Sequence, residues 1–219
     1  MGNYIAFIVV LCISCNKKLK DMIGSTLEFP GVLIPLSSFG IIGIIAFVLY
    51  FISVRHRHKE DNAQITDTVP LTYAGVLLGM GIGGFIDGIF LHQILQWHEM
   101  LTNRLPAISI EAKGVNMFWD GLFHAFTLLV VILGVMALWK MSLRPYAEKS
   151  AWLLNGGFLC GWAVFNLVEG IINHHILKLH NVRDNVADPD MWNYAFLLLS
   201  AMLLIAGWLL LRYYKRVTK

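Results

Sequence analysis

The hydrophobic positions of this chain fall into five long, nearly unbroken runs separated by short polar stretches. Each run has the length of about 20 residues or more that an α-helix needs to cross the hydrocarbon core of a bilayer. The runs lack the polar face that a helix on the surface of a soluble protein carries. The pattern therefore predicts five transmembrane helices, at residues 32–54, 72–97, 115–139, 151–177 and 191–212.

The composition favours an all-α integral membrane protein, a five-span helical bundle. Hydrophobic residues make up 57% of the 219 residues and charged residues 14%, whereas about 25% charged is usual in soluble domains. We expect residues 32–219 to form one transmembrane helical domain. Residues 1–31 form a separate N-terminal segment, whose apolar part at 4–14 is too short to span a bilayer. That part is typical either of a signal-peptide core or of an interfacial segment.

The basic residues indicate the orientation of the bundle. If the C-terminus lies in the cytoplasm, the basic clusters at 55–59, 140–149 and 212–219 all face inside, and the outer side carries fewer Lys and Arg. This arrangement follows the positive-inside rule. We therefore expect a multi-pass protein of the bacterial inner membrane, with the lipid bilayer as its partner. The net charge of +3 is then a topology signal and gives no reason to expect nucleic acid as a partner.

One motif occurs twice within these runs. Residues 87–98 (DGIFLHQILQWH) align with residues 169–180 (EGIINHHILKLH), 82 positions later. An acidic residue, a Gly and two His match between the copies. Ionisable groups within hydrocarbon are energetically unfavourable, so a motif that keeps them twice indicates a function.

The similarity extends beyond this motif. Residues 74–79 match 156–161 at the same offset, and Phe118-Trp119-Asp120 matches Met191-Trp192-Asn193 after a shorter loop. We interpret the bundle as a duplicated two-helix unit. Because each unit contains two spans, both copies enter the membrane from the same side, as parallel repeats related by a pseudo-two-fold axis along the membrane normal. The units are repeat A, residues 72–139, and repeat B, residues 151–212.

Acidic and histidine side chains of three predicted spans fall at similar depth. With a rise of about 1.5 Å per residue, they share a layer in the outer half of the bilayer. Carboxylates and imidazoles together are ligands of zinc, iron, manganese and copper, and the absence of a thiolate or thioether group argues against Cu(I). We expect a divalent transition metal here. The proposed ligands are Asp87, His92, Asp120, His124, Glu169 and His174.

A second group of polar residues borders this layer. His98 and His180 each follow an acid by eleven positions and return to its helix face, so we expect them at the membrane surface, where they would admit an ion. The others would hydrogen-bond to ligands and orient them. The group comprises His98, His175, His180, Gln93 and Asn173.

The residues leave three alternatives open. Haem b held between His92 and His174 is a second choice of cofactor, since the two occupy equivalent positions on different helices. Nearby carboxylates argue against it. A proton or ion relay would use the same acids and histidines without a metal, and a structural polar network would use them for neither. Whether the protein is a metal-dependent enzyme or handles metals or cofactors is undecided by the sequence.

Three segments carry a resemblance to a known family: residues 84–98, residues 120–124, and residues 166–170 together with His174 and His175. In these segments the chain resembles the bacterial predicted membrane proteins grouped as domain of unknown function 2243. The resemblance covers about residues 70–212 and implies a multi-span membrane protein. It implies no cofactor or catalytic residue, so the metal site is inferred from the residues alone.

Overall fold

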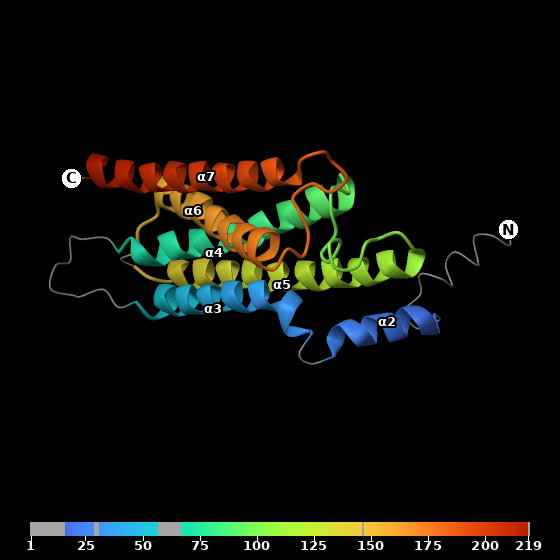
Figure 1. Cartoon of the computed structure of the whole chain (residues 1–219). Helices are drawn as coiled ribbons and strands as arrows, with labels where there is room; N and C mark the ends of the chain where they lie inside the picture. Colours follow the sequence, from blue (N-terminus) through green and yellow to red (C-terminus); the bar gives the residue numbers. More distant parts are fainter. Residues whose placement is uncertain (1–15, 29–30, 57–66, 146, 219) are drawn as a thin grey trace, which may run out of the picture.

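The described part of the chain is helical throughout. The computed structural model describes residues 16–28, 31–56, 67–145 and 147–218. Within them no β-strand occurs, which confirms the all-α prediction. Two π-helical segments, η1 and η2, directly continue α4 and α6 (Figure 1). The elements are α2 (Lys17–Leu27), α3 (Leu33–Arg55), α4 (Val69–Ile86), η1 (Asp87–Ile94), α5 (Ile110–Ser142), α6 (Ala151–Glu169), η2 (Gly170–Ile176) and α7 (Pro189–Val217).

Five helical segments are long and apolar enough to cross a membrane. They are α3, α4 with η1, α5, α6 with η2, and α7, and they coincide with the five hydrophobic runs, so this prediction is confirmed. Many large apolar side chains on them face outward, as expected for helices in contact with lipid. Ile44, Leu129 and Leu198, for example, are each more than 60% exposed.

A short helix, α2, precedes the first span. Its N-cap is Asn16, whose side chain accepts a hydrogen bond from the backbone N–H of Leu19. Leu19 is fully buried, and the indole N–H of Trp119 in α5 donates to the hydroxyl of Thr26, so α2 packs against α5. The apolar residues 4–14, on which the signal or interfacial prediction depended, lie outside the described residues.

Helices α4 and α6 cross in backbone contact at glycines. A Cβ atom at Gly79 would overlap the carbonyl group of Phe158, and one at Gly161 would overlap the carbonyl group of Val76. The two contacts are related by a shift of 82 positions on both helices. Only glycine permits so close an approach. The crossing fixes the ends of α4 and α6 relative to each other, and η1 and η2 begin at these ends.

The remaining helices surround the α4–α6 pair. Helix α5 lies against α4, α7 lies against α6, and α3 packs on α4 and α5. The connections 95–109 and 177–188 lie at one end of the bundle (Figure 1). At the opposite end the Arg144 guanidinium donates to the carbonyls of Val54 and His56, which holds the end of α3. The buried acids and histidines gather at the end with the two connections.

Candidate metal centre

The π-helical segments bring acid and histidine together. An α-helix would place residues five apart about 140° from each other around its axis. In η1 and η2 the backbone hydrogen bonds span five residues, which brings such residues toward one side of the helix. Asp87 and His92 are five apart, and so are Glu169 and His174. The local π-helical winding therefore makes each pair meet.

After each π-helical segment the chain turns back. Gln96 has a φ of 49° and Lys178, 82 positions later, a φ of 48°. Positive φ values are unusual for residues other than glycine and concentrate at functional sites. The reversal places His98 and His180 beneath the helix ends, where they are 2% and 0% exposed. The two histidines, which the sequence places at the membrane surface, are therefore enclosed by protein.

Each of these histidines is tied to the opposite connection. His98 Nδ1–H donates to the carbonyl of Val182 at 2.8 Å, and His180 Nδ1–H donates to the carbonyl of Met100 at 2.9 Å. A carbonyl oxygen only accepts, so Nδ1 carries the hydrogen in both rings. The rings stack with their centroids 4.6 Å apart. In both, Nε2 is the atom left to face the other buried groups.

His98 is a neutral imidazole in this position. Burial, followed by the neighbouring His92, His180 and His174, holds the pKa of His98 well below its ordinary value. Its Nε2 is buried and has no hydrogen-bond partner among the described residues. A neutral ring with a free lone pair is the form of histidine that binds metal ions.

Glu169 lies between two histidines. Its Oε1 is 3.0 Å from His174 Nε2 and 2.9 Å from His180 Nε2. The Asn173 amide donates to the same oxygen at 3.4 Å. Two ligand atoms that share one ion at about 2.0–2.1 Å lie about 2.9–3.4 Å apart at right or tetrahedral angles. Both distances from Glu169 Oε1 to the histidines fit ligands of a single metal ion, and the ligand atoms of all three residues lie within 4.8 Å of one another.

His92 lies between two aspartates. Its Nδ1 is 2.8 Å from Asp120 Oδ1, and its Nε2 is 3.3 Å from Asp87 Oδ2. Asp120 holds the Nδ1–H and leaves Nε2 for a ligand, an arrangement that often supports metal-binding histidines. Two groups of ligand atoms each lie within 4.8 Å of one another. One group comes from His92, His98 and His180, and the other from Glu169, His174 and His180. His180 belongs to both groups.

Many polar atoms of this cluster have no hydrogen-bond partner within the described chain. Each such buried atom costs about 1–3 kcal/mol. No Lys or Arg in the described segments forms an ion pair with the acids of the cluster; the Lys–carboxylate pairs that occur are Lys18–Glu111 and Lys113–Glu99. Lone pairs that converge without hydrogen-bond donors repel one another, and a bound cation would stabilise them. The unpartnered atoms include Oδ1 of Asp87, Nε2 of His98, Oε2 of Glu169 and Nδ1 of His174.

The same backbone contacts recur in both halves, with one chemical difference. The backbone N–H of Met100 donates to Asp120 Oδ1 at 3.0 Å, and that of Val182 donates to Asn193 Oδ1 at 2.9 Å. Asn193 thus stands where the first half has Asp120. His174 Nδ1 has no partner among the described residues, whereas His92 Nδ1 pairs with the carboxylate of Asp120.

Three residues predicted to belong to the site lie outside the cluster. His124 Nδ1 is 2.7 Å from a carbonyl of its own helix, and its ring packs on Phe123. Gln93 is exposed. The half-buried ring of His175 packs against Tyr194, with centroids 5.1 Å apart. The predicted ligands that converge are Asp87, His92, Asp120, Glu169 and His174.

The chain matches one protein family over most of its length. The family described as predicted membrane protein (DUF2243) matches residues 74–214. The chain belongs to this family. The DUF2243 segment includes η1, α5, α6 and η2 and most of α4 and α7, and so contains the whole cluster, whereas α2 and α3 precede it. The resemblance seen in the sequence is confirmed. No curated protein and no solved structure matches the chain.

Proposed function

We propose that this membrane protein is a metalloprotein that holds a divalent transition-metal ion in the buried cluster. The observation that carries the proposal is the buried convergence of imidazole nitrogens and carboxylate oxygens, several of which have no hydrogen-bond donor among the described residues. Asp120 would orient His92 by accepting a hydrogen bond from the His92 Nδ1–H, and Asp87 lies beside His92. The atoms that would bind the ion are Nε2 of His92, His98, His174 and His180 and a carboxylate oxygen of Glu169.

The donor set bears on the identity and number of ions. Nitrogen and oxygen ligands suit zinc, iron, manganese or Cu(II), and no sulfur atom belongs to either group. His180 Nδ1 is occupied by the Met100 carbonyl, so His180 has one nitrogen to offer and serves one ion. One central ion accounts for both groups through this shared residue. A second ion would have to rest on His92, His98 and Asp87.

The packing of the four rings argues against haem b. The ring centroids of His92 and His98 are 4.2 Å apart, and those of His174 and His180 are 4.9 Å apart. The stacked pair of His98 and His180 links these two contacts into one compact group. A porphyrin held between His92 and His174 would have to displace both stacked rings. A bare ion requires no such rearrangement.

Burial favours a resident cofactor over a protein that passes ions on. A transfer path would need accessible ligands at the surface, which is the role that the sequence assigned to His98 and His180. Both are buried and fixed by backbone hydrogen bonds. Rigid, desolvated ligands suit an ion that stays in place and supplies either Lewis-acid or redox chemistry.

A second candidate function is a proton relay without metal. Both ring nitrogens of His180 contact acceptors, the Met100 carbonyl and Glu169 Oε1. A doubly protonated His180 paired with an ionised Glu169 satisfies both contacts. This function leaves Nδ1 of His174 and Nε2 of His98 without a partner among the described residues. The metal site accounts for more of the unsatisfied atoms, so we prefer it.

Cobalt(II) titration separates the two functions. Detergent-purified protein would be stripped with a chelator and titrated with Co²⁺, whose visible absorption reports nitrogen and oxygen ligation. The metal site predicts saturable bands at an integral ratio of cobalt to chain, lost in His98→Gln and kept in His56→Gln, a histidine at the opposite end of the bundle. Weak, unsaturable absorption that both variants share would contradict the proposal and leave the relay.

A further inference from the structure

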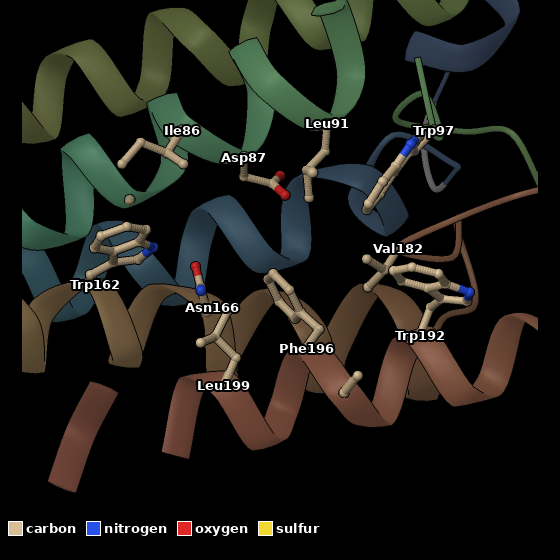
Figure 2. A pocket seen from close by; sticks show the side chains of 12 residues that line it. Ile86, Asp87, Leu91, Trp97, Trp162, Asn166, Val182, Trp192, Phe196 and Leu199 are labelled. Carbon is tan, nitrogen blue, oxygen red and sulfur yellow. The ribbon is translucent and has the colours of Figure 1, made fainter. Parts of the chain in front are cut away.

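A pocket lies directly beside the cluster. It has a volume of about 270 Å³ and is formed by α4, η1, α6, α7 and the two connections. Figure 2 shows Asp87 and Asn166 directed into it from opposite helices, among apolar side chains. Oδ1 of Asp87 and Oδ1 of Asn166 are buried without a hydrogen-bond partner in the described chain. The pocket therefore offers uncommitted acceptors between apolar walls.

Aromatic residues close the pocket at both ends. Trp97 and Trp192 meet at the end near the connections, with ring centroids 5.1 Å apart. The Arg183 guanidinium lies over both indoles, 5.0 and 4.8 Å from their centroids, and covers this end as a cation–π contact. Trp162 bounds the other end (Figure 2). Access along the bundle axis is thereby blocked.

The open side of the pocket faces lipid. Ala195 and Leu199 line it from α7 and are exposed, with Leu199 at 51%. Both belong to a helix that spans the membrane, so their exposed surface meets hydrocarbon. Helices α4 and α7 have little direct contact with each other. A molecule dissolved in the bilayer can enter between them without crossing water.

The equivalent space beside Glu169 is filled. At the same sequence offsets, Phe165 stands where the open pocket has Gly83, and Phe123 stands where it has Phe196. The rings of Phe123 and Phe165 are 5.9 Å apart and both residues are buried. Phe39 of α3 covers them, 5.8 Å from Phe123. One side of the cluster is closed by aromatic packing, and the side with Asp87 retains a pocket.

We propose that this pocket binds a lipophilic molecule whose polar end carries a hydroxyl group, and presents that hydroxyl to Asp87 at the edge of the metal cluster. The apolar walls and the lipid-facing opening select a membrane-soluble body. The unpartnered carboxylate and amide oxygens select a hydrogen-bond donor. Asp87 belongs to both sites, since its Oδ2 lies 3.3 Å from His92 Nε2. Binding of the molecule does not depend on the proposed metal function, but its role as a substrate rests on that function.

Photolabelling of the whole protein in lipid nanodiscs tests this. The probe is a long-chain alcohol with a diazirine on its chain, compared with its methyl ether and with the corresponding primary amine. We expect the alcohol to label peptides containing Leu91, Phe196 or Leu199, saturably and about tenfold more than the ether, a difference of about 1.4 kcal/mol. Asn166→Leu should reduce the preference for alcohol over ether.

Two tryptophan variants provide the matched comparison. Ala195→Trp fills the mouth of the pocket, whereas Ala125→Trp makes the same change at an exposed position of α5. The first should abolish saturable labelling and the second should retain it. Equal labelling by alcohol and ether, stronger labelling by the amine, or no effect of Ala195→Trp would overturn the proposal.

Metal content measured on the same samples keeps the two proposals apart. Both tryptophan variants should retain the metal of the unmodified protein, since neither alanine belongs to the cluster. Saturable labelling of a protein without metal would refute the metal function and leave the pocket intact. A metal-containing protein without saturable labelling would refute the pocket proposal and leave the metal function intact.

Discussion

His98 and His180 stack with their planes 10° from parallel, and each ring donates a hydrogen bond to the connection that carries the other. His98 reaches the carbonyl of Val182, and His180 reaches the carbonyl of Met100. The pair thus joins the two connections and fixes the orientation of both rings. It leaves both Nε2 atoms facing the buried acids and histidines, which makes the pair the centre of the proposed site.

The shared position of His180 leads to the first prediction. Loss of a residue that only supports a ligand weakens metal binding by about 10–100-fold. Since His180 belongs to both ligand groups, His180→Gln should weaken metal binding by more than this. His124→Gln should leave the affinity unchanged, because His124 belongs to neither ligand group. Competition with a chelator of known affinity measures both. A larger loss in the His124 variant would show that the ligand set is misassigned.

Asp120 is predicted to act through His92. Asp120→Ala removes the acceptor for the His92 Nδ1–H and for a backbone N–H, and should weaken metal binding by about 10–100-fold. Asp120→Asn keeps an acceptor oxygen and should recover much of this loss, with full occupancy at excess metal. The same chelator competition applies. Complete loss of binding in both variants would instead make Asp120 a direct ligand.

The crossing of α4 and α6 should not tolerate a methyl group. Gly161→Ala places a Cβ against the carbonyl of Val76, and overpacking of this kind typically costs about 1–3 kcal/mol. Gly121→Ala has open space around its Cβ and should be neutral or slightly stabilising. Thermal unfolding in detergent compares the two. Equal melting temperatures would show that the close crossing is absent.

The neutral state of His98 predicts a pH effect on the chelator-treated protein. Its pKa lies well below the ordinary value of 6.5 when folded, so below about pH 6.5 the unfolded chain takes up a proton that the folded chain does not. Stability should therefore fall as pH drops, by at most about 1.4 kcal/mol per unit for this group. His92, His174, His180 and Glu169 face His98 and are common to wild type and variant.

His98→Leu isolates that contribution. Unfolding midpoints between pH 7.5 and 5 should decline less steeply in the variant than in the wild type, even though the variant is less stable throughout. A steeper decline in the variant would mean that His98 is protonated in the folded protein.

The sequence predicted the five spans because uninterrupted apolar runs directly reflect the thickness of the bilayer. It also marked Asp87, His92, Asp120, Glu169 and His174, since acids and histidines within such runs are rare. It gave no sign of the packing of α2 against α5. That contact depends on a hydrogen bond between residues far apart in sequence, Trp119 and Thr26.

The role of His98 and His180 was missed for a local reason. Counting residues along an ideal α-helix placed them at the membrane surface, whereas the π-helical winding and the positive φ of Gln96 and Lys178 turn the chain back. No single residue type in the sequence predicts a π-helix. The recurrence of His98 as His180, 82 positions later, was the available signal. It identified the two residues but not where they lie in the fold.

The measurement that tests the central claim most directly is the metal content of the purified protein by mass spectrometry, for wild type, His180→Gln and His56→Gln. We predict a near-integral ratio of one transition metal to chain in the wild type, retained in His56→Gln and lost in His180→Gln. A wild-type protein without metal after purification and reloading, or a ratio that the His180 change leaves intact, would contradict the metal site.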